Sequence, residues 1–263
     1  MKAGDNLGKI VAVANQKGGV GKTTTAVNLG ACLAQHGQKV LLVDGDPQGN
    51  ATSGVGIEKA DVDACVYNVV VEDMDTKQVI CPTAVENLSI IPATIQLAGA
   101  EIELVSTISR EVRLKRALET VKDQYDYIII DCPPSLGLLT LNALTAADSV
   151  LIPVQCEYYA LEGLSQLLNT VRLVQKHLNH HLRIEGVLLT MLDARTNLGL
   201  QVTAEVKKYF QERVYQTIIP RNVRLSEAPS HGAPVILYDS KSRGAAVYME
   251  LAKEVIYNGE RIR

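Results

Sequence analysis

Apolar runs of strand length alternate with amphipathic stretches of helix length along nearly the whole chain. The apolar runs predict strands at residues 10–14, 39–44, 88–91, 127–131, 150–154, 184–190 and 214–219. The amphipathic stretches predict helices at residues 22–36, 110–122, 160–177, 200–210 and from 244 to the C-terminus. Because strands that alternate with helices form parallel sheets through right-handed crossovers, we expect an α/β fold. The sequence contains no linker or repeat, so we predict one domain over residues 1–263, with a mostly parallel twisted sheet and helices on both faces.

The composition agrees with this layered fold and limits the classes of partner. Hydrophobic residues make up 47% of the 263 residues and charged residues 21%, while Trp is absent and Phe occurs once. A core built from Val, Ile, Leu and Ala is typical of parallel strands that helices cover on both faces. The formal net charge is -3, so any contact with nucleic acid must come from a local basic patch.

Nothing in the sequence predicts a membrane-spanning or secreted protein. No stretch reaches the roughly 18 consecutive apolar residues that a membrane span needs. Residues 1–9 are polar and carry no secretory signal. No two cysteines form a CxxC pair, which indicates reduced thiols, so we expect a cytoplasmic protein. The five cysteines are Cys32, Cys65, Cys81, Cys132 and Cys156.

A glycine-rich loop follows the first predicted strand and leads into the first predicted helix. Its glycines let backbone N–H groups approach phosphates closely, and the helix adds the positive end of its dipole. Lys22 is placed to reach the β- and γ-phosphates of a nucleotide, and the Thr23 hydroxyl to bind Mg²⁺. A standard phosphate loop has a further glycine where this chain has Gln16. The predicted nucleotide-binding residues of the loop are Lys17, Gly18, Gly19, Val20, Gly21, Lys22, Thr23 and Thr24.

Two other predicted strands end in acidic residues. Asp44 and Asp46 follow the second strand, and Pro47 and Gly49 then favour a turn rather than a helix over residues 45–56. Asp131 ends an apolar run, which is the arrangement of a Walker B strand that reaches the Mg²⁺ shell. Because the carboxyl ends of the strands line the crevice where α/β sheets bind ligands, these acids are candidates for a site that binds ATP and Mg²⁺.

Together these motifs resemble the ParA/MinD superfamily, whose phosphate loop reads KGGxGKT. The runs DGDPQGN at residues 44–50 and DCPPS at residues 131–135 resemble its two switch segments. The resemblance implies that Lys17 crosses a dimer interface to contact phosphates bound by the other subunit. It also implies that Asp44 binds Mg²⁺ through water and that Asp46 orients the attacking water. A cation supplied by the other subunit stabilises phosphoryl charge and couples dimerisation to ATP.

The resemblance covers essentially the entire chain and is strongest to chromosomal ParA proteins of the Soj type. QCEYYALEG at residues 155–163 and IPRNVRLSEAPS at residues 219–230 carry it. It implies an ATP-dependent sandwich dimer on the nucleoid that binds double-stranded DNA without sequence preference. It implies a ParB-type centromere-binding partner that stimulates hydrolysis, and chromosome-origin segregation, often with an influence on the replication initiator. Pro220 and Asn222 would lie at the adenine, and Arg195 and Arg224 match the DNA-contact positions best.

The local charge of the C-terminal part agrees with a DNA contact. Residues 207–263 contain ten basic and six acidic residues, a local excess of four in an acidic protein. A dimer doubles this patch, and affinity that comes from phosphate neutralisation rises steeply with the number of contacts. We therefore expect the DNA-binding surface in this part of the chain.

Three other functions stay open. A MinD-like membrane-cycling ATPase needs a basic amphipathic C-terminal helix with bulky apolar residues, which Gly259 and Glu260 interrupt. An iron–sulfur reductase component needs cysteines that bridge a cluster, for which Cys132 and Cys156 are the candidates. A scaffold that binds nucleotide without hydrolysis is disfavoured because both switch I acids are present. We therefore predict an ATPase that does not act at a membrane.

Overall fold

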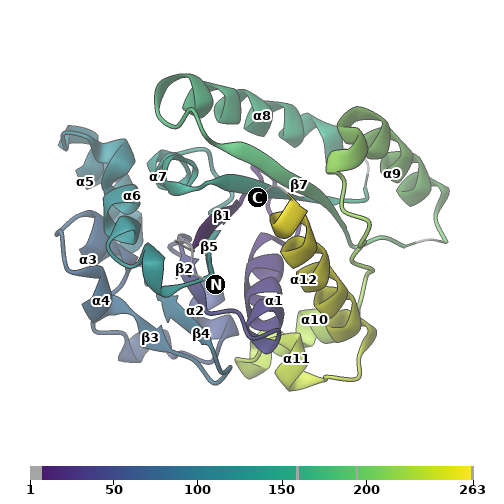
Figure 1. The fold of residues 1–263 in the computed structure, drawn as a ribbon, viewed down its shortest axis with the longest axis horizontal. Helices are drawn as coiled ribbons and strands as arrows, with labels where there is room; N and C mark the ends of the chain where they lie inside the picture. The colour runs from purple at the N-terminus through teal and green to yellow at the C-terminus, as the bar shows by residue number, and fades with distance from the viewer. Residues whose placement is uncertain (1–7, 158–159, 194, 262–263) are drawn as a thin grey trace, which may run out of the picture.

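The computed structural model describes residues 8–157, 160–193 and 195–261. Within them, seven strands form one sheet in the order β3-β4-β2-β5-β1-β6-β7 (Figure 1). Every pair of neighbours is parallel except β3 and β4. The strands are β1 (Lys9–Val13), β2 (Val40–Asp44), β3 (Cys81–Pro82), β4 (Leu88–Ile91), β5 (Tyr127–Asp131), β6 (Ser149–Gln155) and β7 (Arg183–Thr190).

Helices cover both faces of this sheet. The α-helices are α1 (Lys22–Gln35), α2 (Asn50–Gly54), α3 (Val66–Val70), α4 (Thr76–Val79), α5 (Leu97–Glu103), α6 (Arg113–Glu119), α7 (Leu138–Ala146), α8 (Ala160–His177), α9 (Asn197–Phe210), α10 (Val223–Glu227), α11 (Val235–Tyr238) and α12 (Arg243–Arg261). Short 3₁₀ helices are η1 (Lys59–Asp61), η2 (Leu104–Ser106), η3 (Arg110–Val112), η4 (Lys122–Gln124), η5 (Gln211–Arg213) and η6 (Ala228–His231).

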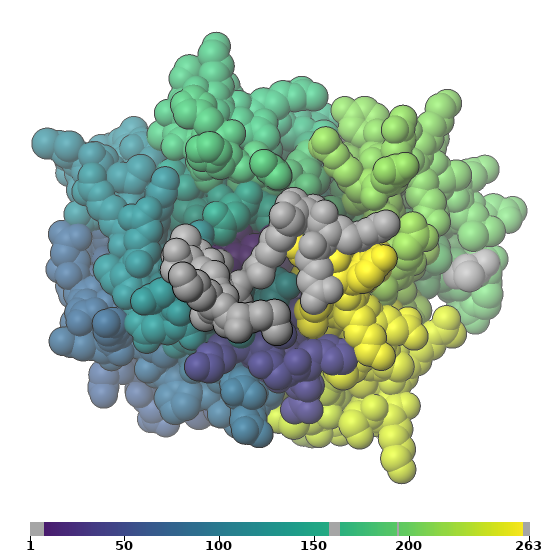
Figure 2. All heavy atoms as spheres, viewed as in Figure 1, coloured from purple at the N-terminus to yellow at the C-terminus, as the bar shows by residue number. Residues whose placement is uncertain are grey.

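The two faces of the sheet bury two separate hydrophobic cores. Ile10 and Ala12 of β1 point into a core that α7 and α8 complete, whereas Val11 and Val13 point into a core shared with α1 and α12. This alternation follows from the two-residue period of a strand. Figure 2 shows the surface on the side of the second core, where atoms of the C-terminal helix (yellow) lie beside those of the N-terminal part of the chain (purple). The predicted α/β fold with a mostly parallel sheet is confirmed, and most predicted elements agree with the structure within a few residues at each end.

Residues 45–56 do not form the helix-free loop that the sequence predicts. Helix α2 lies within them, and Gly49 precedes it in the left-handed conformation (φ 62°). Gly49 also passes close to the backbone of Ala93, because a Cβ at this position would lie 2.7 Å from the Ala93 carbonyl oxygen. Gly49 therefore starts a helix instead of preventing one, and this helix returns Thr52 to the end of β2.

The predicted strand at residues 214–219 is also wrong. Only Val214 of this segment forms a bridge to β7, with Val187, and the next bridge joins Pro220 to Leu192 beyond the end of β7. The next backbone N–H groups, of Gln216 and Thr217, donate to the carboxylate of Glu254 in α12, at 2.7 and 3.0 Å. Because a side chain takes these donors, a regular ladder with β7 does not continue.

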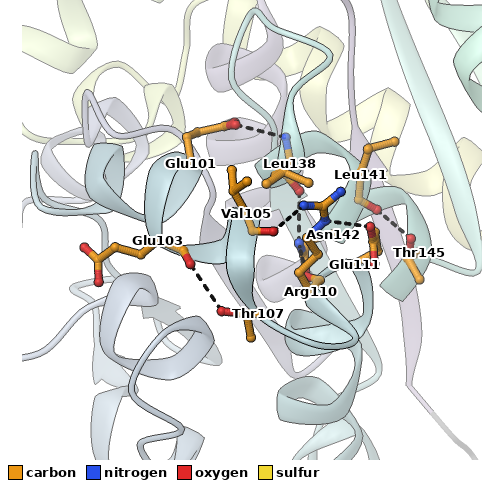
Figure 3. Close-up of polar contacts among 10 residues, drawn as sticks. All are labelled: Glu101, Glu103, Val105, Thr107, Arg110, Glu111, Leu138, Leu141, Asn142 and Thr145. Carbon is orange, nitrogen blue, oxygen red and sulfur yellow. Dashed lines mark hydrogen bonds and ion pairs between the residues drawn. The ribbon is translucent and has the colours of Figure 1, made fainter.

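The predicted helix at residues 110–122 is divided into η3, α6 and η4. Asn142 of α7 lies at the junction of the first two pieces (Figure 3). Its Nδ2 donates to the Arg110 carbonyl at 2.8 Å, and its Oδ1 accepts from the Leu114 N–H at 3.2 Å. A buried amide on another helix thus replaces part of the intrahelical bonding.

Of the predicted family motif at residues 155–163, residues 158–159 lie outside the described part of the chain.

Candidate functional site

The order of the strands brings the three predicted motifs together. β5 lies between β1 and β2, so the loop after β1 and the acids that end β2 and β5 meet at the carboxyl edge of the sheet. Asp131 is the register partner of Asp44 on one side and of Val13 on the other. Ligands of open α/β sheets bind at this edge. The structure therefore places the phosphate loop and both switch segments at one site.

The phosphate loop is fixed by contacts to neighbouring strands. Asn15 is buried, donates from Nδ2 to the Pro153 carbonyl at 2.7 Å and accepts from the Lys17 N–H at 3.0 Å. The Thr190 hydroxyl at the end of β7 donates to the Val20 carbonyl at 2.9 Å. Gly21 adopts φ 90° directly before α1, a conformation that side chains rarely permit. The loop thus has a fixed backbone that leads into a helix N-terminus, as anion binding requires.

Lys22 lies inside the loop. Its side chain is 6% exposed, and its Nζ donates to the Lys17 carbonyl at 3.1 Å. Burial lowers the pKa of the Lys22 ammonium, while the nearby carboxylates of Asp131 and Asp46 raise it. A buried ammonium that donates to a single carbonyl has capacity for further acceptors, and phosphate oxygens are suitable ones.

Asp44 and Asp131 form a pair of fully buried acids. The Asp44 carboxylate accepts from the N–H and the hydroxyl of Thr52, both at 2.7 Å. Burial raises the pKa of Asp44 to about 6, and the Thr52 hydrogen bonds oppose this rise. Both carboxylate oxygens of Asp131 lack a hydrogen-bond partner within the described residues. Burial, and then the charge of Asp44, raise the pKa of Asp131 well above its ordinary value, and the nearby Thr23 hydroxyl opposes the rise although no hydrogen bond of good geometry joins it to Asp131.

These residues fit Mg²⁺. Two neighbouring buried carboxylates, one of them without any hydrogen-bond donor, are costly unless a cation neutralises them. Mg²⁺ commonly takes one or two carboxylates and completes its shell with water and phosphate oxygens. The described residues contain no cluster of three or more His, Cys, Asp or Glu side chains that could hold a metal alone. Thr23, Asp44 and Asp131 would therefore hold Mg²⁺ together with a bound phosphate, and the ion would neutralise phosphate charge.

The second switch I acid and the loop lysine lie at the same edge. Asp46 is buried, and its Oδ1 accepts from the Gln48 N–H at 3.0 Å. Lys17 is half-buried, and its ammonium makes no hydrogen bond or ion pair with any described residue. Gly18 and Gly19 beside it are exposed. The structure thus leaves the Lys17 ammonium available to a group outside this chain.

Pro220 and Asn222 are brought to the same site from the other end of the chain. They line a cavity of about 300 Å³ together with Gly21 and Thr24, at the start of α1. Asn222 also caps α10, because its Oδ1 accepts from the Arg224 N–H at 2.9 Å. A cavity beside the phosphate loop with one proline and one amide is suited to a planar base.

The two predicted DNA-contact arginines lie outside the nucleotide site and are already paired. Arg195 makes a bidentate contact with Asp193 at 2.9 and 2.7 Å, which holds the pKa of Asp193 well below its ordinary value. Arg224 contacts Glu227 at 2.8 Å and Asp239 at 3.2 Å. Each of the two guanidinium groups thus already has a carboxylate partner, while the excess of four, which subtracts Glu227 and Asp239, is unchanged.

The cysteines proposed for an iron–sulfur cluster are not at the surface. Cys132 and Cys156 are 1% and 5% exposed, and both are free thiols. Burial raises the pKa of each thiol, which opposes the thiolate form that binds metals. Their positions disfavour a cluster shared between subunits.

Three residues that hold the site in place could not be predicted from the sequence. Asn15 and Thr52 lie close to the motifs, yet small polar residues in a loop carry no distinctive signal. Glu101 of α5 lies far from them in the sequence, but its carboxylate accepts from the Leu138 N–H at 3.0 Å (Figure 3) and from the Leu139 N–H at 3.2 Å. It thereby caps α7, the helix that follows switch II, in place of the N-cap residue Gly137, which has no side chain.

Comparisons with known proteins agree with this site. Residues 8–184 match the model of a family described as AAA domain. The chain is 79% identical over 253 residues to the sporulation initiation inhibitor protein Soj of Bacillus subtilis, over 96% of this chain and 100% of that protein. It is 56% identical over 250 residues to the chromosome partitioning protein ParA of Myxococcus xanthus, over 95% of this chain and 88% of that protein.

Two solved structures share the fold. A cobyrinic acid a,c-diamide synthase from Mycobacterium smegmatis with bound ADP and magnesium superposes with a TM-score of 0.86 and 39% identity, over 97% of each chain. The septum site-determining protein MinD of Pyrococcus horikoshii complexed with Mg-ADP gives a TM-score of 0.78 and 26% identity, over 94% of this chain and 95% of that chain. Both are complexes with an adenine nucleotide and magnesium.

Proposed function

The chain belongs to the AAA-domain family and within it to the ParA/MinD superfamily, close to Soj, and from this membership we propose how its site works. It is an ATPase of the chromosome-partitioning type that uses ATP and Mg²⁺. We infer that one ParA-type ATPase domain spans residues 1–263. The observation that carries the proposed mechanism is the pair of buried carboxylates beside Lys22.

Each residue of the site has a role in transferring the γ-phosphoryl group to water. Lys22 and the N–H groups of residues 17–24 hold the phosphates, while Thr23, Asp44 and Asp131 hold Mg²⁺. Asp46 orients the attacking water, whose oxygen bonds to the γ-phosphorus as the bond to the bridging oxygen breaks. Catalysis by position and charge alone is slow, so a partner is needed for rapid turnover.

An ATP-dependent homodimer completes the site. Lys17 is the residue that crosses to the other subunit, and its support is the ammonium without a partner among the described residues. Further support comes from exposed apolar residues that follow the carboxyl end of β4, at the edge of the sheet that holds the nucleotide. A second copy on this face would cover them. They are Ile95, Ile102, Val105 and Ile108.

The dimer binds double-stranded DNA without sequence preference, through Arg195 and Arg224. A ParB-type centromere-binding protein stimulates hydrolysis and release, and a replication initiator is a second target. The protein acts in the cytoplasm on the nucleoid. Among the described helices, none has the length and apolar character needed to cross a bilayer.

The decisive experiment measures phosphate release with and without duplex DNA and a ParB-type protein. We expect low basal turnover and a large stimulation only when both are added. Asp46→Ala should bind ATP, dimerise and hold DNA without hydrolysis, and undiminished phosphate release would remove Asp46 from its role. Lys17→Ala should bind ATP but remain monomeric in gel filtration with light scattering. An ATP-dependent Lys17→Ala dimer would contradict the contact across the interface.

A further inference from the structure

A large groove lies at the edge of the sheet, far from the nucleotide site. It measures about 600 Å³ and lies between the C-terminal half of α8, the start of β7 and the end of α9 with η5. β7 begins at Arg183 in the groove and ends at Thr190, which contacts the phosphate loop. Since a strand rises about 3.3 Å per residue, roughly 20 Å separates the groove from that loop. Figure 1 shows α8 and α9 beside β7 at this edge.

Three arginines from separate elements line the groove. They are Arg172 of α8, Arg183 of β7 and Arg213 of η5, and no aspartate or glutamate is among the lining residues. Within the described residues, the Arg183 and Arg213 guanidinium groups make no ion pair, and Arg172 has a hydrogen bond only to the Asn169 amide at 3.2 Å. The nearest acid in β7, Glu185, is paired with Lys9 at 2.7 Å instead.

This arrangement differs from that of three other exposed arginines, although Arg116 and Arg243 likewise make no ion pair within the described residues. Arg195, Arg221 and Arg224 are exposed, yet each is paired with a carboxylate. Three guanidinium groups of the same charge line one groove, and a ligand with several anionic oxygens would accept hydrogen bonds from them. The groove therefore has the charge of a site for a ligand with several negative charges.

The rest of the lining is apolar, aromatic or neutral polar. Val171 and Phe210 are buried and contribute apolar surface, and Gln175 and Gln211 contribute carboxamide groups. Tyr209 is 63% exposed at this groove and contacts the ring of Phe210 edge-on, with 4.8 Å between ring centroids. Apolar surface, an exposed ring and amides are suited to a planar heterocycle.

We propose that this groove is a second ligand site, which binds a nucleotide through its phosphates and its base. The three arginines bind the phosphates, and Tyr209 stacks on the base. Its volume lies within the range of small-molecule sites, about 300–1,000 Å³. The site is separate from the one that hydrolyses ATP and does not depend on the proposed partition function.

The test uses titration calorimetry of GDP and ADP into the Lys22→Ala protein, in which the phosphate-loop site is disabled. We expect one nucleotide to bind per chain. Adding the Arg183→Ala and Arg213→Ala substitutions to the Lys22→Ala protein should lower the affinity for this nucleotide at least about tenfold. The control pair Lys115→Ala/Arg116→Ala removes the same charge from α6 and should leave the affinity unchanged. In the wild-type chain, ADP should bind at two sites and at one site after the Arg183→Ala/Arg213→Ala change.

Further arms identify the ligand. Tyr209→Ala should weaken the binding of GDP and leave the binding of inorganic pyrophosphate unchanged. Pyrophosphate that binds as tightly as GDP would show a site for phosphate alone and overturn the nucleotide assignment. No second site in either protein, or equal affinity after loss of Arg183 and Arg213, would overturn the site itself. If the Arg183→Ala/Arg213→Ala change weakens binding of a 20-base-pair DNA duplex but not of either nucleotide, the groove belongs to a DNA-binding surface and the proposal is wrong.

Discussion

Two polar regions of this molecule hold charge in opposite ways. At the nucleotide edge, Asp44 and Asp131 are completely buried, and the Asp131 oxygens have no hydrogen-bond partner within the described residues. On the C-terminal surface, Arg195 and Arg224 are exposed, and each is paired with at least one acid of the same chain. The first region is incomplete without a cation, whereas the two arginines of the second already have carboxylate partners without any ligand.

This contrast indicates which contact is strong and which is exchangeable. A buried charge without a partner is costly, so a ligand that neutralises it binds tightly. An exposed arginine must first break its ion pair with a carboxylate before it can bind a phosphate. Salt then screens the attraction between the arginine and the phosphate. A tight ATP site and a weak, reversible DNA contact would suit the proposed cycle, in which the protein binds and leaves DNA with each hydrolysis.

The largest expected effect tests the nucleotide edge. Lys22→Ala removes the buried ammonium that faces the phosphates, and charge-assisted hydrogen bonds to phosphate are among the strongest contacts available. We expect the affinity for Mg·ATP to fall by about 100-fold or more, measured with a fluorescent ATP analogue. Lys39→Ala, at an exposed lysine before β2, is the matched control. Near-normal affinity in Lys22→Ala would remove the phosphate loop from the proposed site.

The next effect is a pH dependence of stability in the protein without nucleotide. Asp44 has its pKa raised from 3.8 to about 6, mainly by burial, so the folded state binds the proton more tightly than the unfolded state. Stability is therefore greatest below pH 4 as far as this group is concerned, and falls as the pH rises through about 6. One pKa unit corresponds to about 1.4 kcal/mol, which makes the loss on the order of 3 kcal/mol. Asp131 acts in the same direction.

Urea unfolding at pH 4.5 and 6.5 measures this dependence. Asp44→Asn should show a smaller loss of unfolding free energy over the same interval than the wild-type chain. Mg·ATP should remove most of the wild-type loss, because the cation stabilises the ionised carboxylates. Identical pH profiles of unfolding free energy for the wild-type chain and Asp44→Asn would mean that burial does not raise the pKa of Asp44.

A smaller effect tests the hydrogen bonds that hold Asp44 at the nucleotide edge. The Thr52 hydroxyl donates to Asp44 and accepts from the Ala93 N–H at 2.9 Å. Thr52→Val leaves both partners short of one hydrogen bond in a buried place, so we expect a loss of about 2 kcal/mol in unfolding free energy. Ser53→Ala in the same helix removes a hydroxyl that donates to the Gly49 carbonyl near the surface. Equal losses in the two variants would show that Asp44 gains nothing special from Thr52.

The sequence was sufficient where chemistry and pattern are local. The phosphate loop, Asp44 and Asp131 are read from short motifs at the ends of apolar runs, and parallel pairing then brings them to one edge. Thr52 was missed because α2 was predicted as a loop, although Gly49 can start a helix as well as a turn. Glu101 was missed because its partners, Leu138 and Leu139, are distant in the sequence and meet it only in the folded chain.

The charge count could not show which arginines are paired, for the same physical reason. Residues 207–263 carry a net excess of four, but the count cannot show that Arg224 lies against Asp239, fifteen positions away, as well as against Glu227. Pairing depends on the fold of the C-terminal segment. Composition therefore gives the net charge of this segment, and the fold determines which of its arginines are paired.

The smallest expected effect tests that availability directly. Glu227→Gln removes one of the two carboxylates that hold Arg224, so a DNA phosphate competes with Asp239 alone. We expect affinity for duplex DNA in the presence of ATP to rise about two- to fivefold, since exposed ion pairs are weak. Arg224→Ala should lower affinity and reduce the slope of log affinity against log salt by about one. Glu250→Gln makes the same charge change on an exposed part of α12 and is the control. If Glu250→Gln raises affinity as much as Glu227→Gln does, net charge alone governs DNA binding and the pairing of Arg224 does not limit it.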